Sequence, residues 1–354
     1  MPFRAAAQSQ PMSNRLTENR KKANTMKTRS LPLATIVVSL ALGCFAVQPA
    51  QAQQPAFPDR PIRMGYGFAA GGSGDIAARL LADVATKVLG QQVVVENRTG
   101  ANGMIAAEAI AHSPADGHNV LFCTTGNMTI ITELPGTQLP VNPATELIAL
   151  SQLLRSTFGL VVSKNSPWRT TQDLINDARA NPGKISYASP GVGSVQHLSS
   201  ELLSQKAGLK MIHVPYRGSQ AALPDLVSGR TGFSITNLGD VINHVRQGQL
   251  RLLALGDPLG RQFFPEAPMI SEVVPGFETY AWFGLCGPKG MRPAVIKRWE
   301  EAVKAAVEDP AVSKKLLDNG MVPAFQDAAA LTRTMEENRK NYREIIKAAN
   351  IRAD

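Results

Sequence analysis

The strongest constraint on the fold is the regular alternation of short apolar runs with amphipathic segments along most of the chain. The predicted strands are 62–68, 92–96, 119–123, 160–163, 185–188, 211–214, 232–235, 250–255 and 281–287. The predicted helices are 75–89, 103–111, 171–180, 194–207, 221–228, 293–307, 310–319 and 328–348. Strands that alternate with helices build βα units, so the sequence predicts an α/β fold with mainly parallel sheets.

The alternation restarts after residue 158, and this restart predicts a second lobe. We expect lobe 1 to comprise residues 57–155 together with 281–354, and lobe 2 to comprise residues 156–280. Loops rich in proline and glycine fall near the points where the chain would pass between the lobes. A chain of this length is sufficient for two domains, each with its own core.

The first 52 residues have the layout of a Sec signal peptide. Basic residues precede an apolar stretch, 31–47, which leads into the small-residue sequence Ala50-Gln51-Ala52. This layout predicts cleavage after Ala52 and export to the periplasm. Met26 begins a shorter version of the same signal, so residues 1–25 can come from an upstream start codon. A retained membrane anchor is the alternative, but the apolar stretch is short for a bilayer.

Removal of the signal changes the charge of the chain. The signal contains seven Lys and Arg residues and one acid, so its loss lowers the net charge from +9 to +3. The remainder has no basic run interleaved with aromatic residues, and we expect no nucleic-acid partner. Its histidines lack HExxH or cysteine spacing, so neither a metal site nor a cofactor is expected.

Two cysteines remain after the signal, Cys123 and Cys286, each inside an apolar run predicted as a strand. A disulfide would suit an oxidising periplasm. Two cysteines do not by themselves establish a bridge, and we expect two buried free thiols.

The most informative segment is a glycine-rich loop, Phe68-Ala69-Ala70-Gly71-Gly72-Ser73-Gly74-Asp75, between a predicted strand and a predicted helix. Such a loop directs unpaired backbone N–H groups and the positive end of a helix toward one point, which suits a carboxylate or phosphate. The residues assigned to ligand binding here are Phe68, Ala70, Gly71, Gly72, Ser73 and Asp75. The alternative is a plain glycine-rich turn in which Asp or Ser caps the helix.

A second loop of the same design, Ser189-Pro190-Gly191-Val192-Gly193-Ser194, precedes the helix that carries His197. Open α/β sheets bind ligands at the carboxyl ends of their strands, where both loops lie, so the two loops can face each other across a cleft. The candidate binding residues here are Ser189, Gly191, Gly193, Ser194 and His197. Neither loop matches a nucleotide-binding fingerprint.

Further candidates lie outside the two loops, and catalysis is not expected. The turn 98–103 and the turn that contains Thr125 and Asn127 each follow a strand and could supply neutral donors, although plain connections explain them equally well. Tyr216 could also line the cleft. The first loop is not GxSxG, because Asp75 occupies its fifth position. Ser194 and His197 lie three residues apart on one helix, where a histidine more often packs or binds a ligand than acts as a base.

An ordered set of short motifs marks a resemblance that covers nearly the whole chain from Phe57 onward. The motifs are Phe57-Pro58-Asp59-Arg60-Pro61-Ile62, Val93-Val94-Val95-Glu96-Asn97-Arg98, Ala115-Asp116-Gly117, Asn181-Pro182-Gly183-Lys184, Tyr187-Ala188-Ser189, Gln196-His197-Leu198, His213-Val214-Pro215-Tyr216 and Ala281-Trp282-Phe283-Gly284-Leu285. Each motif is weak alone, but the ordered set resembles the Bug family, the periplasmic substrate-binding components of tripartite tricarboxylate transporters. The resemblance implies a two-lobed periplasmic-binding-protein (Venus-flytrap) fold with two doubly wound mixed sheets and a hinge.

The resemblance also implies a function. The two glycine loops would hold a carboxylate of a small organic acid, and the protein, expected to be a monomer, would deliver this ligand to membrane permease subunits. Family members bind di- and tricarboxylates, amino acids, nicotinic-type acids and aromatic acids. Two alternatives remain open, namely a receptor that feeds a sensor kinase and a secreted hydrolase.

The chain departs from the family pattern at two places that matter for ligand choice. Residues 67–72 lack the three prolines of the family's Pro-Phe-Pro-Pro-Gly-Gly loop, so this loop is expected to be less rigid. Near Thr236 and Asn237, both assigned to the binding site, the family commonly has an Asp before the Asn. Thr236 replaces that carboxylate, which weakens the case for a ligand that bears an amine.

Overall fold

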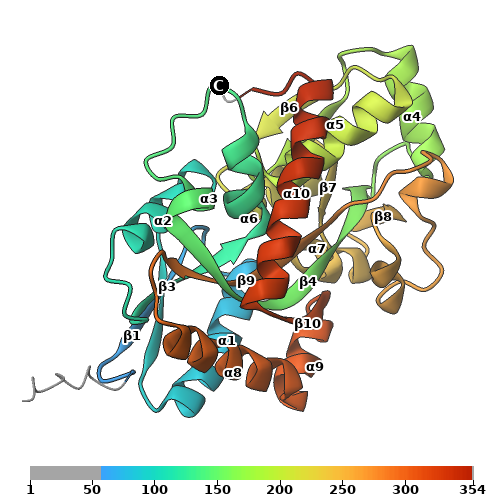
Figure 1. Cartoon of the computed structure of the whole chain (residues 1–354). Coiled ribbons are helices and arrows are strands. Elements are labelled where there is room, and N and C mark those ends of the chain that lie inside the picture. The colour runs from blue at the N-terminus through green and yellow to red at the C-terminus, as the bar shows by residue number, and fades with distance from the viewer. Residues whose placement is uncertain (1–56, 353–354) are drawn as a thin grey trace, which may run out of the picture. The chain divides into compact units, whose positions relative to one another are not determined.

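The computed structural model describes residues 57–352, and its helices and strands follow the alternation expected from the sequence (Figure 1). The strands are β1 (Ile62–Tyr66), β2 (Val93–Asn97), β3 (Asn119–Thr124), β4 (Leu147–Ser163), β5 (Ser186–Ser189), β6 (Ile212–Pro215), β7 (Phe233–Asn237), β8 (Leu250–Leu255), β9 (Tyr280–Pro288) and β10 (Met321–Asp327). The helices are α1 (Ser73–Leu89), α2 (Met104–Ala111), α3 (Pro143–Glu146), α4 (Thr171–Ala180), α5 (Val195–Ala207), α6 (Ser219–Ser228), α7 (Leu238–Arg246), α8 (Pro293–Glu308), α9 (Pro310–Asp318) and α10 (Ala328–Ala348). The predicted signal peptide, residues 1–52, lies outside the described residues.

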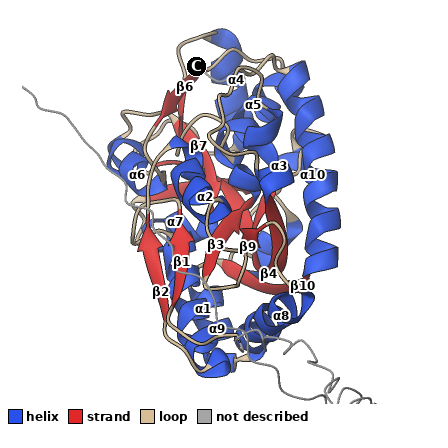
Figure 2. Cartoon of the chain, turned by 60° about the vertical axis from the view of Figure 1, so that its left-hand side comes forward, coloured by secondary structure: helices blue, strands red, loops and turns tan. Residues whose placement is uncertain are grey.

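One long strand, β4, connects two sheets. Up to Thr157 it pairs antiparallel with β9 and β10, and from Phe158 it pairs antiparallel with β7 and β8. On one side the sheet continues through β3 to β1 and β2, and on the other side through β5 to β6 (Figure 2). The outer pairs on both sides are parallel, so both sheets are mixed. This arrangement confirms the predicted α/β class.

Four elements of the sheet and its connections differ from the prediction. β4 begins at Leu147 rather than at residue 160, and α3, α7 and β10 had no predicted counterpart. β10 contains Pro323, a residue that normally argues against a strand interior but is tolerated at a sheet edge. α7 follows β7 without an intervening turn, because Asn237 ends the strand and Leu238 begins the helix.

Two large hydrophobic cores hold the described residues together. In one core the apolar faces of α1 and α8 cover β1 and β3, with Trp299 and Leu81 fully buried. The other core contains residues from both predicted lobes, among them Trp282, Tyr187 and Met335. Met335 lies on α10, which packs against both β4 and α5 (Figure 1). The C-terminal helix assigned to lobe 1 therefore also contacts lobe 2.

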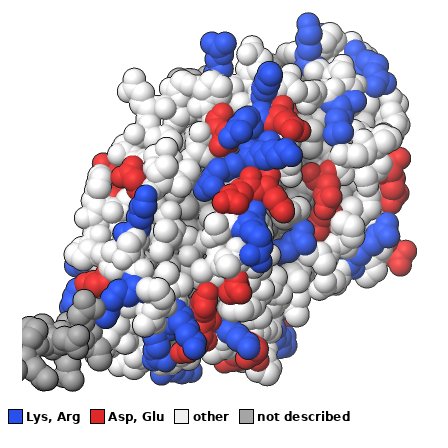
Figure 3. Space-filling model, in the orientation of Figure 1, with Lys and Arg blue, Asp and Glu red and all other residues white. Residues whose placement is uncertain are grey.

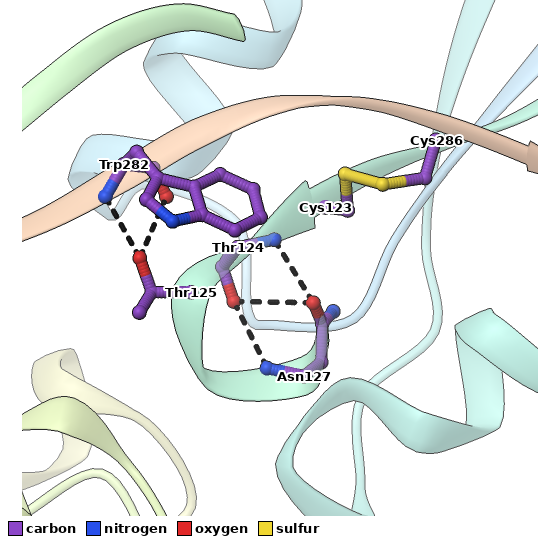
Figure 4. The surroundings of a disulfide bond; sticks show 6 residues. All are labelled: Cys123, Thr124, Thr125, Asn127, Trp282 and Cys286. Atoms are coloured by element: carbon purple, nitrogen blue, oxygen red, sulfur yellow. Dashed lines mark hydrogen bonds between the residues drawn. A yellow bond between two sulfur atoms is a disulfide. The ribbon is translucent and has the colours of Figure 1, made fainter. Parts of the chain in front are cut away.

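The two cysteines correct one prediction, because they are joined rather than free. Cys123 on β3 and Cys286 on β9 form a disulfide, with their Cα atoms 5.8 Å apart, and both side chains are fully buried (Figure 4). The residues are 163 positions apart in sequence. The return of β9 to pair antiparallel with β3, where Cys286 lies opposite Leu121, brings them together. Sequence spacing alone could not show this pairing.

The surface of the described region carries mixed charge on the face that displays α10. Lys and Arg side chains alternate there with Asp and Glu side chains (Figure 3). Among residues 57–352, every helix is too short or too polar to cross a membrane.

Candidate functional site

A cavity of about 650 Å³, counting the part that is open to solvent, lies between loops of the two predicted lobes. Residues at the ends of β1 and β3 and at the beginnings of α1, α5 and α7 form its wall. Helix beginnings carry unpaired N–H groups and partial positive charge, so this arrangement favours an anionic group in the cavity.

The first wall is the beginning of α1. The helix starts after Gly72, which has no side chain to cap it. Instead the backbone N–H of Ser73 donates a hydrogen bond of 3.0 Å to Oδ1 of Asp240, which lies on α7 in the second lobe. A carboxylate from the opposite lobe therefore caps α1.

Asp75 supports the glycine turn from inside the protein rather than facing the cavity. Its carboxylate accepts hydrogen bonds from the N–H of Gly71, from Nδ2 of Asn97 and from Arg79, each at 2.9 or 3.0 Å. Burial alone would raise the pKa of Asp75, but the hydrogen bonds from Arg79, Asn97 and Gly71 outweigh it and lower the pKa. Asp75 is thus an ionised anchor for the turn.

Gly74 is required because of Tyr66. A Cβ atom at Gly74 would overlap the Tyr66 hydroxyl and would lie 2.9 Å from Cε1 of Phe283. Both rings line the cavity, and both are largely buried. A side chain at Gly74 would therefore displace the aromatic wall of the cavity.

The second wall is the beginning of α5. Oγ of Ser194 accepts a hydrogen bond from the N–H of His197 and donates one to the carbonyl of Gly191. The N–H of Gly193 donates to Nδ1 of His197. Ser194, Val195 and Gln196 line the cavity. The amides of Val195 and Gln196 belong to the first turn of the helix, whose N–H groups lack partners within the helix.

His197, in the first turn of α5, supports the second loop. Its ring stacks on His213, with ring centroids 3.9 Å apart, and on Tyr187. Burial, reinforced by the neighbouring His213, lowers the pKa of His197 to about 3. His197 is therefore neutral at physiological pH and accepts the Gly193 N–H through Nδ1.

Two hydrogen bonds cross the cavity from one predicted lobe to the other. The first is the Ser73 to Asp240 bond, and the second joins Nδ2 of Asn102 to the carbonyl of Gly193 at 3.0 Å. Asn102 has a left-handed backbone conformation, with φ of 51°, which an ordinary L-residue adopts at a cost. The bonds hold the lobes of the described structure against each other.

The comparisons with known proteins identify the family. Residues 77–351 match the family described as "Tripartite tricarboxylate transporter family receptor" (TctC). The chain belongs to this receptor family. A Cupriavidus necator protein described as "UPF0065 protein in gbd 5'region" is 36% identical over 306 residues, which cover 86% of this chain and 92% of that protein. Protein BugT of Bordetella pertussis is 32% identical, covering 83% and 89% of the two chains. The resemblance to the Bug family is confirmed.

Solved structures show the same fold. The structure titled "R. palustris Rpa4515 with adipate" has a TM-score of 0.80 and 31% identity, and the alignment covers 84% of this chain and 99% of that one. The periplasmic binding protein BugD has a TM-score of 0.76 and 25% identity, with 84% of this chain and all of that one covered. The two-lobed periplasmic-binding-protein fold is therefore confirmed for this family member.

The structure brings some of the residues assigned from the sequence to the cavity. Those that line it are Phe68, Gly72, Ser73, Thr125, Ser194 and Asn237. Gly191 and Tyr216 line a second, adjoining cavity, to which Phe68 also contributes. Ser189 and Thr236 line a third, smaller cavity. The Thr125 hydroxyl is engaged with the backbone of Trp282, accepting from its N–H at 2.9 Å (Figure 4).

The remaining assigned residues do not line any of these three cavities. Ala70 and Gly71 are exposed on the outside of the first loop, and Asp75, Gly193 and His197 support the loops from behind. Asn127 is fully buried, and its Oδ1 accepts the N–H of Thr124 (Figure 4). Within residues 57–352 no cluster of His, Cys, Asp and Glu suited to a metal ion occurs.

Several cavity residues were not assigned individually from the sequence, namely Tyr66, Asn102, Gln196, Gln220 and Asp240. Asn102 lies in the turn 98–103, which the sequence marked as one that could line the cleft, and the structure places this residue in the cavity wall. Asp240 gave no such signal, since it lies on α7, a helix that was not predicted.

Proposed function

We propose that this protein is a periplasmic solute-binding receptor that holds a small carboxylated organic solute between its lobes and delivers it to a membrane permease. The observation that carries the proposal is that the beginnings of two helices, α1 and α5, from different predicted lobes line one cavity. Each contributes a serine and the N–H groups of a first helical turn, although Asp240 already accepts the Ser73 N–H of α1. Neither helix beginning supplies a side chain with its own positive charge. A carboxylate held by neutral donors fits this arrangement.

The proposed ligand class agrees with the ligands of related structures. One structure of the family contains adipate, and another, MatC of Rhodopseudomonas palustris, contains malate. The proposed lobes are residues 57–155 with 281–354 and residues 156–280. Their hinge would lie where β4 passes from one sheet to the other, next to the hydrogen bond from Gly256 N–H to the Phe158 carbonyl. Closure would follow from tighter ligand binding to the closed state.

The geometry of Ser194 argues for a receptor rather than a hydrolase. A nucleophilic serine needs its hydroxyl hydrogen-bonded to the ring of a base. The Ser194 hydroxyl instead donates to a backbone carbonyl and accepts a backbone N–H, and Nδ1 of His197 is engaged with Gly193. Ser189 does contact Nε2 of His213 at 2.6 Å, but its side chain is almost fully buried beneath the loop.

A thermal-shift screen of the purified protein against mono-, di-, tri-, hydroxy- and amino-carboxylic acids tests the proposal. A ligand at a concentration of 100 times its Kd adds about 2.7 kcal/mol to the free energy of unfolding, so the bound acid should raise the Tm by several degrees. The absence of any acid that raises the Tm would contradict the proposal. Release of a product from the bound acid would favour the hydrolase.

A pair of glycine variants tests whether the second loop binds the acid. Gly193→Ala places a Cβ against the Leu134 side chain at a left-handed position, φ of 75°. Gly208→Ala imposes similar backbone strain at the other end of α5, φ of 65°, in open space. We expect Gly208→Ala to cost about 1 kcal/mol of stability and Gly193→Ala to cost more, because its Cβ also collides with Leu134. Only Gly193→Ala should weaken binding in isothermal titration. Equal affinities in the two variants would remove the second loop from the site.

A further inference from the structure

The cavity contains one charged side chain, and its charge is negative. Among the described residues that line the cavity, Asp240 is the only Asp, Glu, Lys, Arg or His. It is 8% exposed, so its carboxylate is largely shielded from water. The beginnings of α1 and α7 offset part of this charge, but no cationic side chain lines the cavity to pair with it. The cavity therefore presents a site for a positive charge.

The hydrogen bonds that Asp240 accepts do not neutralise its negative charge. Oδ1 accepts the N–H of Ser73 at 3.0 Å, and Oδ2 accepts Nδ2 of Asn237 at 3.2 Å. Both donors are neutral, and both residues also line the cavity. In addition, the donor from Ser73 is one of the groups that α1 would otherwise offer to an anionic ligand. Asp240 thus occupies part of the anion site at α1, while the beginning of α5 faces the cavity without an acidic neighbour in its wall.

The aromatic residues of the cavity also favour a cation. Tyr66, Phe68, Phe158 and Phe283 line it, and Tyr66 contacts Phe68 with ring centroids 5.5 Å apart. The negative faces of aromatic rings attract a cation that has lost part of its water shell. Burial, and then the charges of Asp240 and Asp75, raise the pKa of Tyr66 well above its usual value, so the phenol remains neutral.

From this distribution of charge we infer that the solute carries a positively charged nitrogen beside its carboxylate. The inference rests on the proposed function and narrows its ligand class to amino-bearing acids. The nitrogen pairs with Asp240, and the carboxylate lies toward the beginning of α5 near Ser194 and Gln196. A dicarboxylate would place a second negative charge beside a buried carboxylate, which is unfavourable at low dielectric. The argument from Thr236 against an amine is thereby reversed, because Asp240 supplies the carboxylate that Thr236 lacks.

Pairs of acids of equal length test the inference on the purified protein. Succinate, glutarate and adipate are compared with 4-aminobutanoate, 5-aminopentanoate and 6-aminohexanoate, and α-amino acids are compared with the corresponding carboxylic acids without the amine. Isothermal titration measures each Kd for the wild-type protein, for Asp240→Asn and for Asp83→Asn. Asparagine keeps an oxygen acceptor for the Ser73 N–H. Asp83 is exposed in the middle of α1, so its variant controls for the loss of one negative charge.

We expect the wild-type protein to bind its best amino acid at least about tenfold more tightly than the matched acid without the amine. Asp240→Asn should weaken amino-acid binding by about tenfold or more and strengthen binding of the matched dicarboxylate. Asp83→Asn should leave every Kd unchanged. Equal weakening of both ligand classes by Asp240→Asn would show that Asp240 only caps α1, and this would overturn the inference. The inference would also be overturned if a dicarboxylate bound most tightly and Asp240→Asn left its Kd unchanged. If no acid binds at all, the proposed function itself fails.

Discussion

At the scale of single residues, Asp257 is the clearest case of a group whose surroundings oppose its charge. It lies directly after Gly256, which bonds to Phe158 where β4 passes between the two sheets. Its Oδ1 accepts the N–H of Leu259 at 3.0 Å, whereas Oδ2 is buried and has no hydrogen-bond partner among the described residues. Burial raises the pKa of Asp257 to about 6, although the Leu259 N–H and the charge of Arg155 oppose the shift.

This raised pKa predicts how the stability of the protein depends on pH. A carboxyl with a higher pKa in the folded than in the unfolded state stabilises the fold below the unfolded pKa, near 4, and this contribution is lost as the pH rises through about 6. Asp257→Asn should therefore be more stable than the wild-type protein at pH 7.5, by up to about 3 kcal/mol, and should lose this advantage at pH 4. Urea unfolding at each pH measures the difference. A difference that is the same at both pH values would contradict the prediction, and Asp83→Asn is the control without a buried carboxylate.

At the scale of elements, the disulfide joins the two strands that carry part of the cavity wall. Thr124 and Thr125 follow Cys123 on β3, and Phe283 lies three residues before Cys286 on β9. Replacing both cysteines in Cys123→Ala/Cys286→Ala should lower the free energy of unfolding by about 2 to 4 kcal/mol, mainly because the unfolded chain gains freedom. Urea unfolding with and without a reductant measures this loss.

The reductant serves as an internal control for the disulfide prediction. It should lower the urea midpoint of the wild-type protein toward that of the double variant and should leave the double variant unchanged. If the reductant shifts both proteins equally, the cross-link does not account for the difference. Binding of the acid should weaken together with stability, because the same strands position Thr125 and Phe283.

Elements with a clear periodicity or terminal signal were predictable from the sequence, and the rest were not. α4 and α10 begin and end at the predicted residues, and α1 ends at the predicted Leu89, followed by Gly90 in a left-handed conformation with φ of 75°. β10 was missed because Pro323 interrupts it. β4 was missed before residue 160 because polar residues such as Gln152 and Arg155 break its apolar run without regular alternation.

The candidate site likewise contains features that the sequence predicted and features that it did not. The two glycine loops were predictable, since each combines a strand end, glycines and a serine before a helix. Asp240, which gives the cavity its charge, was not predictable, because α7 begins directly at the end of β7 with no turn between them. The contact between Ser73 and Asp240 joins residues 167 positions apart, which only the folded chain brings together.

At the scale of the whole described region, the lobes are coupled more closely than two separate domains would be. The core that contains Trp282 also contains Trp168 and Tyr187 of the second lobe and Met335 of α10. Nε1 of Trp282 donates to Oδ1 of Asn338 on α10 at 2.9 Å. α10 in turn packs against α5. Ligand-driven closure would therefore have to bend β4 while α10 keeps its contacts with both lobes.

This coupling predicts that the two lobes unfold together in one transition. Trp168 reports on lobe 2 and Trp299 on lobe 1, and both are buried, so unfolding changes their fluorescence. In Trp168→Phe the remaining signal comes from Trp282 and Trp299, and in Trp299→Phe it comes from Trp168 and Trp282. We expect the fluorescence and circular-dichroism midpoints in urea to coincide within each variant, even where the substitution lowers overall stability. If the fluorescence of one variant changed at a lower urea concentration than its circular dichroism, the lobes would unfold independently. The core that both lobes share through Trp282 and α10 argues against this outcome.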